Sequence, residues 1–209
     1  MSPHLIPAGA PLTLDPQRTG QERLWDCYDA YVDRVGDRII HDIVHSEPLL
    51  GLMAAVEAGQ ITRGQFLLHT ALLAEGQIGN GGLDQLISNF PQLVEDFAIL
   101  LETLEQDAFL NAYCRVADPM IASLQKARKG PRLVPAKARY LRHCIRVEAT
   151  LTETPQELFD LVDDHFTLIY EDKSDPSRWG VLPKESWATG LCEAVAAYVE
   201  AKPGEFIAA

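Results

Sequence analysis

Two histidines one helical turn apart come closest to catalytic spacing in this sequence. The segment H-D-I-V-H from His41 to His45 places both imidazoles on one helical face, an arrangement that can bind zinc. Zinc proteases with this spacing carry a glutamate base after the first histidine, whereas this chain has Asp42 and no evident third ligand. Helical rotation sets the apolar stripe through Val32 and Ile43 on the opposite side. We interpret the histidines as a solvated pair, with a metal-dependent enzyme as the alternative.

A glycine-rich stretch from Gly76 to Gly82 could cradle an anion, because glycine lets backbone N–H groups approach a phosphate. It departs from the dinucleotide-binding fingerprint, since the sixth position counted from Gly79 is Asp84 and no strand precedes it. We therefore do not expect a nucleotide site. An enzyme that binds a small molecule at this loop stays open as part of the same alternative.

The four cysteines do not form a recognisable site. They are at least 30 residues apart, and no C-x-x-C motif occurs. This spacing indicates neither a disulfide framework nor a cysteine zinc site. We interpret all of them as packing residues and free thiols of a cytoplasmic protein. They are Cys27, Cys114, Cys144 and Cys192.

The net charge of −12 is unevenly distributed along the chain. Residues 1–114 carry −11, residues 115–147 carry +8 and residues 148–209 carry −9. The acidic excess argues against direct binding to nucleic acid or to an anionic membrane, and it suits a basic partner. We expect the basic segment from Lys126 to Arg146 to pair with the protein's own acidic surface.

Apolar residues recur at steps of three and four along most of the chain, which indicates helices. No segment shows the alternation typical of strands, and no apolar run reaches the roughly 18 residues of a membrane span. We predict an all-α fold, an irregular single-domain bundle of about eight or nine helices over 20–209, after a flexible arm over 1–19.

A helix is expected to begin near Gly20, with an apolar stripe from Trp25, and Pro48 is expected to mark a stop and restart before a helix at 49–58. Thr62 and Gln65 have the form of a capping box that opens a helix over 62–73, whose apolar run from Phe66 is expected at the centre of the core. The glycines of 76–82 are expected to break that helix before a short one at 83–88. Further helices are expected from Pro91, from Asp107, and at 136–147, 154–171 and 184–201.

One segment carries a more specific motif. Residues 77–89 read Q-I-G-N-G-G-L-D-Q-L-I-S-N. They resemble the signature E-V-x-N-G-G-[FL]-x-Q-[FYL]-x-x-N of a bacterial family of unknown-function domains that includes the DNA-mimic proteins. Gln77 replaces the usual glutamate, and Leu83 and Leu86 stand where aromatics are frequent. The matching residues are Asn80, Gly81, Gly82, Gln85 and Asn89.

The resemblance covers about residues 25–206 and implies an all-helical fold. It also implies DNA mimicry, in which an acidic surface occupies the DNA-binding face of a regulator. Carboxylates one helical turn apart lie about 6 Å apart along the axis, a spacing comparable to that of phosphates along a DNA strand. The acidic face we expect to do this comprises Glu157, Asp160, Asp163, Asp164, Glu171, Asp172 and Asp175.

The motif also has a direct physical interpretation. Asn80 can cap the helix that follows, and Gly81 and Gly82 allow a tight approach or a positive φ. Gln85 and Asn89 lie four residues apart and can bond the glycine loop back onto itself. We predict a structural clamp, with a ligand or partner site as the alternative.

Together these features predict a non-enzymatic, acidic protein-interaction domain of the bacterial cytoplasm. The partner we expect is a basic or DNA-binding protein, and neither a cofactor nor a metal is expected. A homodimer is compatible with the sequence. A toxin-neutralising or scaffolding protein is a further version of the same class.

Overall fold

The structure is a computed structural model that describes residues 15, 20–32, 34–46, 48–131, 133–166 and 190–206. Every regular element in these ranges is helical, which confirms the all-α prediction for the described residues. The predicted arm over 1–19 lies outside them, Asp15 excepted. The elements are α1 (Gly20–Tyr31), α2 (Arg34–Ser46), α3 (Leu52–Glu57), α4 (Arg63–Asn89), η1 (Pro91–Leu93), α5 (Val94–Thr103), α6 (Asp107–Arg128), α7 (Ala136–Glu153), α8 (Gln156–Phe166), α9 (Gly190–Ala201) and η4 (Pro203–Glu205).

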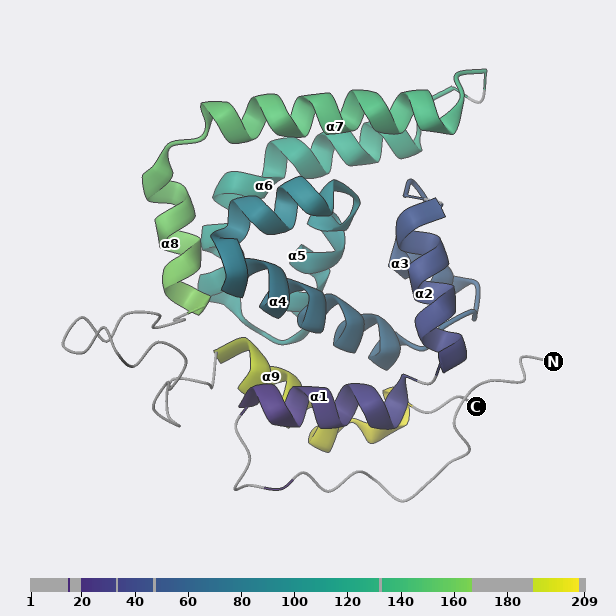
Figure 1. The fold of residues 1–209 in the computed structure, drawn as a ribbon, viewed down its shortest axis with the longest axis vertical. Coiled ribbons are helices and arrows are strands. Elements are labelled where there is room, and N and C mark those ends of the chain that lie inside the picture. The colour runs from purple at the N-terminus through teal and green to yellow at the C-terminus, as the bar shows by residue number, and fades with distance from the viewer. Residues whose placement is uncertain are drawn as a thin grey trace.

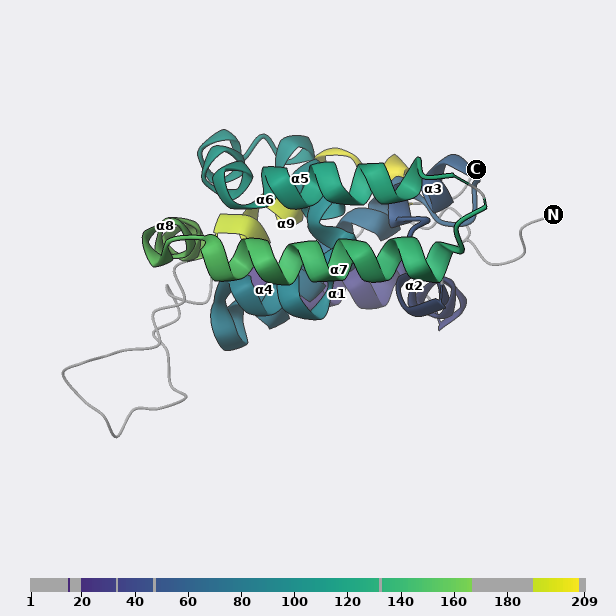
Figure 2. The ribbon, with the colours of Figure 1, turned by 90° about the horizontal axis from the view of Figure 1, so that it is seen from above.

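The helices are arranged around α4, α5 and α6, which occupy the middle of the molecule (Figure 1). Helix α7 lies along one end and packs on α6, and the two run side by side when seen from above (Figure 2). Helices α1 and α9 pack together at the opposite end of the long axis. Helix α8 covers one side, and α2 and α3 cover the other. No described helix is long and apolar enough to cross a bilayer.

One hydrophobic core connects these helices, with buried side chains from α1 to α9. The predicted apolar run after Phe66 is central, because Phe66, Leu67 and Leu68 are almost fully buried. Around Phe97, the aromatic rings pack edge to face, with the Tyr113 ring 4.9 Å away. The Tyr113 hydroxyl donates to the carbonyl of Val94 at 2.7 Å, which satisfies the polar end of a fully buried ring.

The start of α4 follows from its sequence. Thr62 and Gln65 form the predicted capping box, in which Thr62 Oγ1 accepts from the Gln65 backbone at 3.0 Å and Gln65 Oε1 accepts from the Thr62 backbone at 2.9 Å. The remaining amide nitrogen of Gln65 donates to the Tyr31 carbonyl at 3.0 Å. The cap therefore also fixes the end of α1 against α4.

Other helix ends differ from their predicted positions. The stripe assigned to one helix from Gly20 is shared by α1 and α2, and Trp25 on this stripe is 46% exposed. A physical reason is that Gln65 takes up the Tyr31 carbonyl, which a continuous helix would use for its own next turn. Helix α7 continues to Glu153. Residues 184–189, expected to open the last helix, lie outside the described ranges.

Candidate functional site

The family-like motif sits at a break inside α4. Only Gly81 and Gly82 leave helical geometry, with φ/ψ of −161°/18° and 81°/180°. The break predicted over 76–82 is therefore narrower than expected, and residues 76–80 continue the helix. Gly76 and Gly79 are tolerated as helical residues, whereas the positive φ of Gly82 favours glycine.

Side-chain amides bridge this break. The Asn89 amide nitrogen donates to Gln77 Oε1 at 2.6 Å, and the Gln85 amide nitrogen donates to the same oxygen at 3.3 Å. A Cβ atom on Gly81 would overlap with the Gln85 side chain. Gln85 and Asn89 thus meet on the Gln77 side chain rather than on the glycine backbone. The Asn80 amide donates back to the Gly76 carbonyl at 2.6 Å, instead of capping the next helix as predicted.

The predicted acidic face begins on α8. Glu157 and Asp160 are both exposed there, one turn apart, and Gln156 donates to Asp160 Oδ1 at 2.9 Å. The rest of this face lies outside the described side chains, namely Asp163, Asp164, Glu171, Asp172 and Asp175.

A second concentration of acids lies where α1 packs on α9. These two helices carry five carboxylates and one base, and the base, Arg23, pairs with Glu193. Asp29 and Glu200 are exposed. The α1–α9 end is opposite to α7 along the long axis of the molecule (Figure 1).

The basic segment was expected to pair with the protein's own acids, and part of it does. Arg128 pairs with Glu95 and donates to the Leu49 carbonyl at 3.1 Å. Arg139 donates to the carbonyls of Ala127 and Arg128, so it caps the C-terminal end of α6. Within the described part of the chain, no ion pair involves the other exposed cations of α7, which are Lys137, Arg142 and Arg146.

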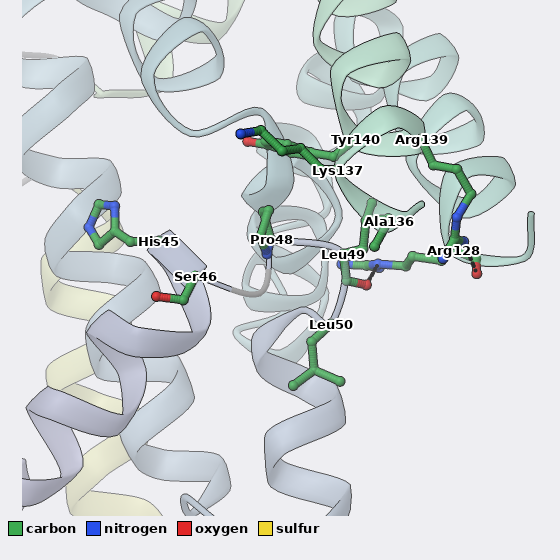
Figure 3. A pocket seen from close by; sticks show the side chains of 10 residues that line it. All are labelled: His45, Ser46, Pro48, Leu49, Leu50, Arg128, Ala136, Lys137, Arg139 and Tyr140. Carbon is green, nitrogen blue, oxygen red and sulfur yellow. Dashed lines mark hydrogen bonds between the residues drawn. The ribbon is translucent and has the colours of Figure 1, made fainter. Parts of the chain in front are cut away.

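A cleft of about 740 Å³ opens between the end of α2, the turn after it and the start of α7 (Figure 3). The side chains of Lys137 and Tyr140 extend side by side over Pro48, and His45 stands on the opposite wall. The Tyr140 hydroxyl donates to Gln92 Oε1 at 2.8 Å. The lining residues are His45, Ser46, Pro48, Leu49, Leu50, Arg128, Ala136, Lys137, Arg139 and Tyr140.

The histidine pair lies on the polar face of α2. The rings of His41 and His45 are 4.3 Å apart between centroids, and both residues are exposed. Asp42 lies 3.9 Å from His41 Nδ1 and 4.0 Å from the Nε of Arg38. The described residues contain no group of three or more side chains placed to hold a metal ion.

Two titratable groups with strongly shifted pKa values, Asp96 and His69, were not identified from the sequence. Asp96 accepts a hydrogen bond from the Leu52 backbone N–H at 3.4 Å and so caps α3. Burial raises the pKa of the Asp96 carboxyl to about 6, although the nearby positive charge of Arg128 acts to lower it. His69 packs against the Tyr28 ring, and burial lowers the pKa of its imidazole to about 4. Asp96 lies 44 residues from its partner, so no local pattern signals it.

This chain matches no protein-family model, no curated protein and no solved structure. The likeness of residues 77–89 to the family signature therefore rests on the motif alone.

Three of the cysteine thiols have raised pKa values. Burial raises the pKa of Cys27 to about 12, and it also raises the pKa values of Cys114 and Cys144. None of these thiols is thereby activated as a nucleophile. Exposed bases gather on α7, which carries Lys137, Arg142 and Arg146, and exposed Asp29 and Glu200 lie at the opposite α1–α9 end. Local groups of like charge attract oppositely charged partners.

Proposed function

We propose that this chain is a non-enzymatic protein-interaction domain that binds a basic partner through acidic surfaces, with DNA mimicry as its most specific form. The observation that carries the proposal is the separation of charge between α7 and the α1–α9 end (Figure 1). A negative surface that no basic helix interrupts can attract a cationic partner over several ångströms of solvent.

The spacing of acids on α1 supports the mimicry form. Glu22, Asp26 and Asp29 recur at steps of four and three, which places them on one helical face. A rise of 1.5 Å per residue separates them by about 6 and 4.5 Å along the axis. Glu157 and Asp160 on α8 repeat a one-turn spacing, and their row continues in the sequence through Asp163 and Asp164.

The proposal can be tested by capture followed by competition. The immobilised chain is exposed to the heparin-binding protein fraction of a bacterial lysate, and each retained protein is purified and shown to bind duplex DNA. The proposal predicts that unlabelled duplex displaces these proteins from the chain. Retention no better than on a neutral control protein of similar size, or retention that duplex DNA leaves unchanged, would count against it.

The cleft beside His45 favours a second candidate, the binding of a small anion. Lys137 and His45 both line this cleft, and neither has an ion-pair partner among the described residues. Calorimetric titration with inorganic phosphate and with pyrophosphate tests this candidate. This candidate predicts saturable binding of the anion, which Lys137→Ala is expected to weaken. Lys126→Ala, at an exposed site outside the cleft, is the control and is expected to leave the affinity unchanged. No heat of binding for either anion would remove it.

A further inference from the structure

Helix α7 exposes two large apolar side chains at its middle. Leu141 and Ile145 lie one turn apart, and each is 59% exposed. The helix lies along the end of the molecule, and its outward face has no described helix beyond it (Figures 1 and 2). Its opposite face packs on α6 and buries His143 and Val147. The outward side chains therefore contribute nothing evident to the core of this chain.

The exposed pair belongs to a longer seam. Ala138, Leu141, Ile145, Ala149 and Thr152 recur at steps of three, four, four and three. At about 100° per residue, all five lie within about 40° of a line through Ile145. These steps are the same when counted from either end. A helix with such a seam can pair with an identical helix running in the opposite direction, so that both present the same sequence of side chains.

The sizes of these side chains fit that arrangement. When Ile145 is set on the two-fold axis, Leu141 of one copy lies opposite Ala149 of the other, and Ala138 lies opposite Thr152. Leu141 then meets a small side chain, as in the interdigitated packing of antiparallel helices, and Ile145 meets Ile145 of the other copy on the axis. With Leu141 on the axis instead, Ile145 would lie opposite Lys137 of the other copy.

Charges at the edge of the seam are complementary in the same register. Arg142 and Glu153 both lie about 60–80° to one side of Ile145. They are exposed, and neither has an ion pair among the described residues. In the antiparallel pair they lie about 7.5 Å apart along the axis, and their side chains lean toward each other because each tilts toward its own N-terminus. Arg146 lies about 100° from the seam and stays in solvent.

We propose that two copies of this chain associate through α7, antiparallel and with Ile145 on the two-fold axis, so that Arg142 of each copy pairs with Glu153 of the other. An 18-residue helix is about 27 Å long. One such helix pair makes a small interface, so we expect a dissociation constant on the order of micromolar. The α1–α9 ends remain free at the two far ends of the dimer, so the pairing does not depend on the proposed function.

Sedimentation equilibrium of the full chain between about 1 and 300 µM tests the pairing, since this range spans a micromolar dissociation constant. The wild-type protein is expected to change from the mass of one chain to that of two. Ile145→Lys places two like charges at the axis and is expected to stay monomeric. Trp25→Lys changes another exposed large apolar side chain, on α1, and is the matched control that is expected to dimerise normally. Unchanged thermal unfolding of each diluted variant shows that it is folded.

A charge-reversal cycle tests the register. Arg142→Glu and Glu153→Arg are each expected to raise the dissociation constant about tenfold, and the double variant is expected to restore it to within about threefold of wild type. A wild-type chain that is monomeric throughout, or an Ile145→Lys variant that still dimerises, overturns the proposal. A double variant that is no better than the single ones overturns the antiparallel register.

Discussion

Asn89 donates its side-chain amide to Oε1 of Gln77, 2.6 Å away, across the break in α4. Gln85 donates to the same oxygen. One acceptor atom therefore joins the two halves of the helix across the point where Gly81 and Gly82 leave helical geometry. A glutamate at this position would offer the same acceptor geometry and add a charge.

Replacing Gln77 tests this connection. Gln77→Leu removes the shared acceptor and is expected to lower the free energy of unfolding by about 1–2 kcal/mol, because two half-exposed amides lose a partner. Gln77→Glu keeps an acceptor oxygen and is expected to be at least as stable as wild type at neutral pH, because charged acceptors bond more strongly. Urea unfolding followed by circular dichroism measures both. A Leu variant as stable as the Glu variant would show that the bridge does not hold the break.

Substitution by alanine is predicted to change the stability of the protein in opposite directions at Gly82 and at Gly76, both in α4. Gly82→Ala forces a Cβ into a backbone region that is nearly exclusive to glycine, which is expected to cost on the order of 1–3 kcal/mol. Gly76→Ala is the control, because this residue is helical and a Cβ there would have no neighbour within 4 Å. It is expected to stabilise the protein by about 0.5–1 kcal/mol. Equal effects of the two substitutions would contradict the conformation assigned to Gly82.

Asp96 and His69 are predicted to give opposite pH dependences of stability. The carboxyl of Asp96 has a pKa raised from 3.8 to about 6, so its contribution is full below pH 3.8 and is lost as pH rises through 6. The imidazole of His69 has a pKa lowered from 6.5 to about 4, so its contribution is full above pH 6.5 and is lost as pH falls through 4. Between pH 4 and 6 the two partly cancel.

Single substitutions separate the two contributions. In urea unfolding at several pH values between 4 and 6, Asp96→Asn is expected to make the free energy of unfolding rise more steeply with pH than in wild type. His69→Gln is expected to make it rise less steeply, by at most about 1.4 kcal/mol per pH unit for one proton. The double variant is expected to lie between them. Parallel curves for wild type and both single variants would show that neither group changes its pKa on folding.

The cysteines are predicted to react slowly in the folded protein. Cys27 is fully buried, and its pKa of about 12 leaves almost no thiolate at pH 8. Reaction with a thiol-specific disulfide reagent is expected to be slow for all four in the native state and rapid after unfolding in urea. The half-buried Cys114 and Cys144 are expected to react first. A single cysteine that reacts at the rate of a free thiol in the native protein would indicate an activated site.

The parts of the fold that were predicted correctly are those set by neighbouring residues. Thr62 and Gln65 are three positions apart, so their capping box is visible in the sequence. Pro48 and Pro91 likewise mark real boundaries, because proline has no backbone N–H to donate. The glycine break was placed too broadly, since composition does not show that only Gly82 needs a positive φ.

The features that were missed depend on contacts between distant segments. The end of α1 follows from the bond between Gln65 and the Tyr31 carbonyl, 34 residues apart. Asp96 caps α3 from α5, and Gln92 joins the end of α2 to Tyr140 on α7. The charge reversal between segments was evident from the sequence, but its placement at opposite ends of the molecule required the packing of the helices.

The most direct test of the acidic interaction surface is the affinity of the chain for a captured DNA-binding protein after charge reversal at the α1–α9 end. Asp29→Lys with Glu200→Lys is expected to weaken binding at least tenfold and to flatten its dependence on salt. Glu57→Lys with Glu102→Lys changes the net charge equally on α3 and α5, at exposed sites, and is expected to weaken binding far less. If the two double variants lose affinity equally, the partner responds to net charge alone, and an interaction surface at α1 and α9 is contradicted.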